Sequence, residues 1–218
     1  MWDYKLLVIL LIIQFYSAQQ QRIDNFPNPR TNGYNKCGLK SKGYVCDPDK
    51  QLSEQERYRL NNDLLQLSRR TSVDQSADFC ITKGVDATLF ITKEGNEQLA
   101  HQLNTVWAID GQCKKSLVFV LSTIDHRLYY SADERAPISA NSFKTIVSEY
   151  QELLNEGKFT TALTSIFMKL GESIQDNNKE RIKPDNMHER ENSTAAPEIS
   201  TFAYFMIISL IALQLPTA

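Results

Sequence analysis

One short segment, residues 117–122 (LVFVLS), constrains the fold more than any other part of the chain. Its apolar residues follow one another without the polar alternation of a strand that has one face in water. A strand of this kind is buried on both faces, so other elements must cover each side of its sheet. The sequence therefore predicts a layered domain built around this strand.

Neighbouring segments extend the strand into a small mixed sheet. Residues 86–92 (DATLFIT) are short, β-branched and apolar, which predicts a second strand. Apolar residues at helical spacing in 96–108 place a helix between the two strands. Such a β-α-β unit is parallel and right-handed. Residues 127–131 follow a turn at 123–126 and predict an antiparallel hairpin partner.

Helices should cover both faces of this sheet. Ser53 and Glu56 have the spacing of a capping box, which predicts a helix over about 53–69. Residues 142–154 and 159–174 carry apolar residues at the same spacing. The expected fold class is α/β, a three-layer α/β/α arrangement with a small mixed sheet.

The beginning of the chain has the pattern of a secretory signal peptide. Lys5 precedes an aliphatic run at 6–13, and the small residues Ser17 and Ala18 follow it. The run is shorter than the about 20 residues that a membrane span needs. We therefore expect residues 1–18 to be removed and the remainder to be secreted.

A second apolar run, residues 202–215, lies near the other end. It is followed by no basic residue, and a polar stretch rich in small residues precedes it. This pattern favours a GPI-anchor signal, with attachment at Asn192 or Ser193, over a short membrane segment. Asn192 also begins a glycosylation sequon and would carry glycan if it is not the anchor site. The expected location is the extracellular face of the plasma membrane.

Secretion makes the four cysteines candidates for two disulfides, and none has the C-x-x-C spacing of a zinc site. Cys37 and Cys46 bracket a short loop. Cys80 and Cys113 each precede a predicted strand, and parallel neighbours begin at the same edge of a sheet, so their Cα atoms could approach the ~5.5 Å of a disulfide. The expected pairs are Cys37–Cys46 and Cys80–Cys113.

Composition divides the chain into five segments. They are a signal peptide (1–18), an extended lead-in (19–45), a folded domain (46–174), a charged flexible stalk with the anchor site (175–200) and an apolar tail (201–218). The net charge is -2 and no basic stripe occurs, so we expect no nucleic-acid partner.

Several motifs occur together in a specific order. They are Val45-Cys46-Asp47-Pro48-Asp49, Leu52-Ser53-Glu54-Gln55-Glu56, residues 99–107 with Asp110-Gly111, residues 113–131 and residues 152–163. Together they resemble the TPM domain, in the form found in the nematode levamisole-receptor modulator family. The resemblance covers about residues 27–174. It implies an α/β/α fold and an extracellular, membrane-held auxiliary protein that tunes a nicotinic, levamisole-sensitive acetylcholine receptor by contact with its subunits.

The resemblance also raises an enzymatic alternative, because plant and bacterial TPM relatives have been linked to acid phosphatase activity. Asp47, Asp49 and Asp110 are weak candidates for a metal site, although aspartate before a helix or in a turn more often has a structural role. We expect no catalytic residue and no cofactor. The alternatives are a metal-dependent acid phosphatase and an extracellular structural or adhesion module.

Two further features concern possible binding sites. Tyr129 and Tyr130 could form an exposed aromatic contact, or one of them could alternate into the core. Residues 132–134 stand where other TPM proteins have a glycine-containing turn, so a site built on that loop does not transfer. His101, His126 and His188 are scattered without metal-ligand spacing.

Overall fold

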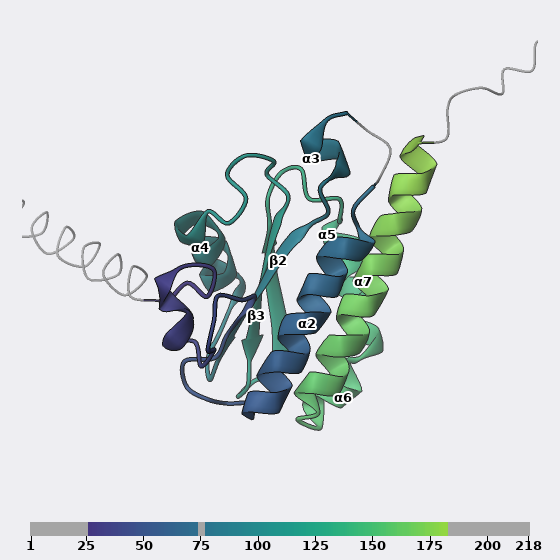
Figure 1. The fold of residues 1–218 in the computed structure, drawn as a ribbon. Coiled ribbons are helices and arrows are strands. Elements are labelled where there is room, and N and C mark those ends of the chain that lie inside the picture. Colours follow the sequence, from purple (N-terminus) through teal and green to yellow (C-terminus); the bar gives the residue numbers. More distant parts are fainter. Residues whose placement is uncertain (1–25, 74–76, 183–218) are drawn as a thin grey trace, which may run out of the picture. The chain divides into compact units, whose positions relative to one another are not determined.

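The structure is a computed structural model that describes residues 26–73 and 77–182 (Figure 1). Its elements, in chain order, are η1 (Asn32–Asn35), β1 (Val45–Cys46), α2 (Glu54–Arg70), α3 (Phe79–Thr82), β2 (Asp86–Thr92), α4 (Glu97–Trp107), β3 (Ser116–Ser122), β4 (Arg127–Ala132), α5 (Ala140–Glu149), α6 (Gln151–Asn155) and α7 (Phe159–Ile182).

The four strands form one mixed sheet in the order β1-β2-β3-β4. β2 pairs in parallel with β3 from Asp86 opposite Ser116 to Thr92 opposite Ser122. β4 runs antiparallel to β3, as the predicted hairpin requires. The two-residue strand β1 pairs in parallel with β2, and the sequence analysis did not predict it. All seven residues of β3 are buried, which confirms the interpretation of its unbroken apolar run.

Helices cover both faces of the sheet, so the predicted three-layer α/β/α class is confirmed. Figure 1 shows α2 and α7 beside each other on one face and α4 on the other. On the first face Leu89 and Phe119 meet Leu64 and Phe167 in one apolar cluster. On the opposite face a second cluster joins the sheet to α4; its buried members include Phe90, Val118, Val120, Leu103 and Trp107.

Local signals explain where most helices begin and end. The Ser53–Glu56 capping box is formed at the start of α2. The predicted helix at 142–154 is instead two helices, α5 and α6, because Tyr150 leaves helical geometry at φ -114° and ψ 10°. The N–H of Tyr150 donates to the carbonyl of Val147, only three residues earlier, which closes α5 with a tight last turn.

α7 is longer than expected and continues through Ile182. The first part of the segment expected as a flexible stalk, residues 175–182, is therefore helical. Gln175 explains part of the extension, since its Nε2 donates to the carbonyl of Arg70 at the end of α2. No helix-breaking proline follows until Pro184.

The lead-in packs on the sheet rather than extending away from it, as far as the structure describes it. The Phe26 ring lies 5.1 Å from the Phe90 ring, centroid to centroid. Arg30 forms an ion pair of 2.8 Å with Asp86 at the start of β2. Residues 26–45 thus belong to the folded domain, a correction of the expected boundary at 46.

The predictions for the signal peptide, the anchor site, the glycosylation site at Asn192 and the apolar tail fall outside the described residues. Among the residues that are described, no helix is both long enough and apolar enough to cross a membrane.

Candidate functional site at the edge of the sheet

Both disulfides join the cysteines that the strand order favoured. Cys37 and Cys46 are linked with a Cα–Cα distance of 4.2 Å, and both lie in the cluster beneath α4. Cys80 and Cys113 are linked at 5.2 Å. Because β2 and β3 are parallel neighbours, the segments that precede them emerge at the same end of the sheet.

Asp47, a weak metal candidate, is fully buried and has a structural role. Its carboxylate accepts from the N–H groups of Gln51 and Leu52 at 2.8 and 2.9 Å. The guanidinium of Arg57 completes the arrangement with an ion pair of 3.3 Å. This carboxylate therefore holds the turn that leads into α2, and the nearby Asp49 is exposed.

Asp110 has a comparable role at the other end of the sheet. Its carboxylate accepts from Lys83 Nζ at 2.8 Å and from the N–H groups of Cys113 and Lys115. Burial alone would raise the pKa of Asp110, but these hydrogen bonds outweigh burial and lower it.

The structure does not bring the metal candidates together. Asp47 follows β1 beside the C-terminal part of β2, whereas Asp110 precedes β3 near the start of β2. Over residues 26–73 and 77–182, no group of three or more histidine, cysteine, aspartate or glutamate side chains could hold a metal ion.

The outer edge of β4 offers backbone groups that no other described strand pairs with. The N–H of Asp133 donates to Ser116, so the hydrogen-bonded pairs of the hairpin include Ser131 with Val118 and Tyr129 with Val120. The alternating residues Leu128, Tyr130 and Ala132 therefore direct their N–H and C=O groups away from β3. β4 is the last strand of the sheet, so these groups face outward.

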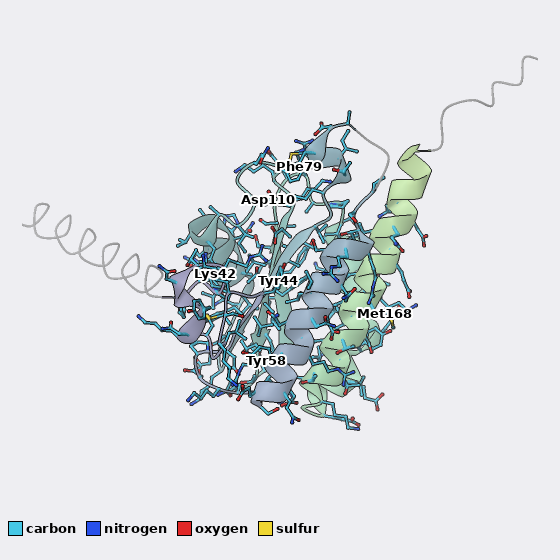
Figure 2. The ribbon with its side chains drawn as sticks, viewed as in Figure 1. Lys42, Tyr44, Tyr58, Phe79, Asp110 and Met168 are labelled. Atoms are coloured by element: carbon cyan, nitrogen blue, oxygen red, sulfur yellow. A yellow bond between two sulfur atoms is a disulfide. The ribbon has the colours of Figure 1, made fainter. Side chains whose placement is uncertain are left out.

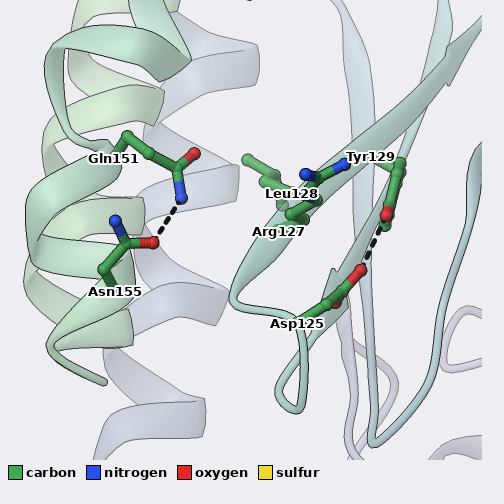
Figure 3. Close-up of a pocket in the computed structure, with 6 residues that line it drawn as sticks. All are labelled: Asp125, Arg127, Leu128, Tyr129, Gln151 and Asn155. Atoms are coloured by element: carbon green, nitrogen blue, oxygen red, sulfur yellow. Dashed lines mark hydrogen bonds between the residues drawn. The ribbon is translucent and has the colours of Figure 1, made fainter.

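A first pocket, the hairpin pocket, opens at the start of β4 and has a volume of about 460 Å³. Figure 3 shows its six lining residues: Asp125, Arg127, Leu128, Tyr129, Gln151 and Asn155. The Tyr129 hydroxyl donates to Asp125 at 2.7 Å, and Gln151 Nε2 donates to Asn155 at 2.8 Å. The hairpin turn is tied to α6, because the Nδ1 of His126 lies 2.8 Å from the carbonyl of Asn155.

The Tyr129–Asp125 pair is a preformed hydrogen-bonding unit. Burial of the phenol, supported by the hydrogen bond to Asp125, raises the pKa of Tyr129. Burial opposes ionisation of Asp125 as well, but hydrogen bonds from Ser122 and Tyr129 outweigh it and lower the pKa of Asp125. The pocket thus presents a carboxylate and a phenol in defined protonation states at neutral pH.

A second pocket, the edge groove, follows β4 at its other end and has a volume of about 420 Å³. α4, β4 and α5 each supply part of its lining: Glu97, Gln98, His101, Tyr130, Ser131, Ala132, Ala140 and Lys144. The Tyr130 ring packs against Phe143 with 3.9 Å between centroids. Charges of both signs, from Glu97 and Lys144, flank the ring without an ion pair between them in the described residues.

The two tyrosines occupy opposite faces of β4, and each is half-buried. Tyr130 packs against the cluster that contains α7, and Tyr129 packs against the cluster that contains α4. The sequence left open whether these tyrosines form an exposed contact or whether one of them belongs to the core. Each ring does both, since it packs against an apolar cluster and also lines a pocket. Sequence reasoning missed the participation of Gln151, Asn155 and Lys144, because only the fold brings these helices beside the hairpin.

Asp133 closes the far end of β4. Its carboxylate accepts from the Ser116 hydroxyl at 2.7 Å and from Asn104 Nδ2 at 2.9 Å. The residues that stand in place of a glycine-containing turn thus fasten the hairpin to α4. This part of the surface is engaged internally, whereas the two pockets and the strand edge are open to a partner.

Comparison with known proteins identifies a family. Residues 21–126 match the family model described as modulator of levamisole receptor-1. The match runs from the lead-in through β3 into the hairpin turn. None of the curated proteins compared with the chain matches it.

One solved structure is similar in part. It is the NMR structure of the BA42 protein from the psychrophilic bacterium Bizionia argentinensis, with 11% sequence identity and a TM-score of 0.45. The similarity covers 60% of this chain and 86% of that chain. The family match agrees with the motifs of the sequence: over residues 21–126 the chain is similar to the modulator of levamisole receptor-1 family.

Proposed function

We propose that this protein modulates a nicotinic, levamisole-sensitive acetylcholine receptor by contacting the receptor from outside the cell. The single observation that carries the proposal is the family match over residues 21–126. Two disulfides in the domain are consistent with an oxidising, extracellular location.

The β4 edge is the contact surface that we favour. An open strand edge can pair with an extended segment of another protein, and the main-chain hydrogen bonds then supply affinity. The hairpin pocket and the edge groove lie near the two ends of this edge and can accept side chains of that segment. Tyrosine is enriched at protein interfaces, and Tyr129 and Tyr130 line the two pockets.

Anchoring through the C-terminal segment belongs to the same proposal. Confinement to the membrane that holds the receptor raises the effective concentration of the domain near its partner. A contact that would be weak in solution can then be populated at the cell surface. A soluble domain should therefore be a much poorer modulator than the anchored protein.

The proposal is tested by co-expression with a levamisole-sensitive acetylcholine receptor and recording of agonist-evoked currents. We expect the full chain to change current amplitude or desensitisation, and a secreted version ending at Ile182 to act far more weakly. Charge reversal at the two pockets, Arg127→Glu with Lys144→Glu, should remove most of the effect. Lys169→Glu is the matched control, because the Lys169 side chain on α7 is 44% exposed and lines neither pocket, and it should leave the effect intact.

Unchanged currents with the full chain at the cell surface would contradict receptor modulation. Equal loss of the effect in the pocket variant and in the Lys169→Glu control would contradict only the choice of the β4 edge. Hydrolysis of a generic phosphate ester by the purified protein, with and without divalent cation, addresses the enzymatic alternative directly.

A further inference from the structure

Two apolar side chains stand exposed together on the short helix α3. Phe79 is 59% exposed and Ile81 is 49% exposed. Cys80, between them, is tied to Cys113 by a disulfide. Lys115 Nζ donates to the carbonyls of Ile81 and Lys83, at 3.3 and 2.7 Å. The exposed pair is therefore presented on a fastened helix.

This apolar tip lies at the end of the domain from which α7 emerges. Gln175 of α7 bonds to Arg70, and the N–H of Val73 donates to the carbonyl of Thr82 in α3. From Gln175 the helix continues seven residues to Ile182, or about 10 Å. Figure 1 shows α3 and the end of α7 at the same end of the molecule, and Figure 2 labels Phe79 and Asp110 there.

Chain length relates this end to the membrane. If Asn192 is the attachment residue, ten residues, 183–192, connect α7 to the lipid, and fully extended they span at most about 35 Å. α7 alone, with its 24 residues, is about 36 Å long. A domain standing with its opposite end on the membrane would need this connection at full stretch. The α3 end is thus the end that the anchor favours.

We propose that Phe79 and Ile81 insert into the interfacial layer of the outer leaflet and fix how the domain stands on the membrane. The inference rests on the C-terminal anchoring in the proposed function. Aromatic and aliphatic side chains of a peripheral protein bury at the boundary between headgroups and acyl chains. Two side chains bind lipid weakly on their own, but the anchor makes their insertion an intramolecular event.

A lipid surface suits this tip better than a protein partner does. A stable protein interface buries about 800 Å² on each side and needs a complementary shape. Phe79 and Ile81 are two isolated side chains, and neither of the two pockets described includes them. A lipid interface needs no shape complementarity.

The orientation has a consequence for the β4 edge. β2 and β3 both begin at the α3 end and run away from it. With this end on the membrane, the strands stand along the membrane normal and the open edge of β4 faces sideways. A neighbouring membrane protein would then meet this edge laterally.

Tryptophan fluorescence in vesicles tests the inference. The full chain carrying Phe79→Trp is reconstituted into phosphatidylcholine vesicles with either plain or brominated acyl chains, since bromine quenches nearby indole. Ile124→Trp is the matched control, because Ile124 is 63% exposed in the turn after β3, at the opposite end of the strands. Wild-type protein gives the background from the chain's own tryptophans, Trp2 and the buried Trp107.

We expect brominated lipid to reduce the added Phe79→Trp emission at least twofold and to leave that of Ile124→Trp unchanged. Vesicle flotation reports anchoring separately. Protein that floats without quenching at position 79, or with equal quenching at position 124, overturns the insertion and leaves the anchor standing. Protein that does not float overturns the anchor and the insertion with it. If position 79 is quenched in vesicles and the quenching is lost only when receptor is added, lipid is still the partner of this tip in the absence of receptor.

Discussion

Asp47 and Asp49 show how differently two aspartates of one motif can act. We expect Asp47→Ala to lower the free energy of unfolding by about 3–5 kcal/mol, because Arg57 would remain buried without its partner. Asp49→Ala, at an exposed position, should change it by less than about 0.5 kcal/mol. Urea denaturation of the two variants makes the comparison. Equal stabilities would refute the structural role of Asp47.

Asp110 should make stability depend on pH. Its pKa is lowered in the folded state, so its contribution is present above the unfolded value of about 3.9 and is lost as the pH falls through the lower folded value. Asp110→Asn should therefore cost about 2 kcal/mol at pH 7, where Lys83 loses a charged partner.

The difference between wild type and Asp110→Asn should shrink when denaturation is repeated below about pH 4. Asp49→Asn serves as the control, since its exposed side chain should give the same small difference at both pH values. A gap between wild type and Asp110→Asn that stays constant from pH 7 to pH 3 would argue against the proposed cause.

Interactions between residues close together in the chain could be predicted from the sequence. The capping box at Ser53 and Glu56 needs only a spacing of three residues, and it is formed as predicted. The partner of Asp110 could not be predicted in this way, because Lys83 reaches it only after β2 and β3 pair. Lys115, which fastens α3 from 34 residues away, was hidden for the same reason.

At the scale of elements, α3 depends on its disulfide. Four residues cannot form a stable helix alone. Replacing both Cys80 and Cys113 by serine should lower the free energy of unfolding by roughly 3–4 kcal/mol in the chain-entropy model for a separation of 33 residues. Hydrogen exchange in residues 79–83 should become faster. Phe79→Ser, which leaves the disulfide intact, should show neither effect.

Element prediction succeeded where periodicity was strong and failed where tertiary contacts decide. β2, β3 and the hairpin follow from apolar runs and a turn. β1 has only two residues, so no periodicity could reveal it, and it exists because Val45 pairs with Leu89. The extra turns of α7 are polar in sequence, and the hydrogen bond from Gln175 to the carbonyl of Arg70 depends on α2 lying alongside.

At the scale of the whole molecule, the mode of anchoring is open to a direct test. We predict a GPI anchor, because a polar stretch rich in small residues (192–196) precedes a short apolar run. Phosphatidylinositol-specific phospholipase C should release the protein from intact cells. A protein that stays on the cells after this treatment, with an epitope at its C-terminus still attached, would instead have a membrane segment.

The fold class was predictable because the buried strand β3 demands a layer on each side. The candidate contact surface at the β4 edge could not be predicted from the sequence, since the hairpin pocket combines residues from β4 and α6. Tyr129 and Tyr130 were visible in the sequence as an aromatic pair. Only the folded sheet places them on opposite faces of β4, where each lines a different pocket.

The two edges of the sheet are unequal in length, and this limits how the protein can assemble. β1 contributes two residues and β4 contributes six. Growth of a fibre by edge pairing needs a long free strand at both sides of each molecule, whereas a single long edge allows one pairing and then stops. A dense array of these molecules on a cell surface would therefore yield pairs at most, and edge-to-edge polymers would not propagate.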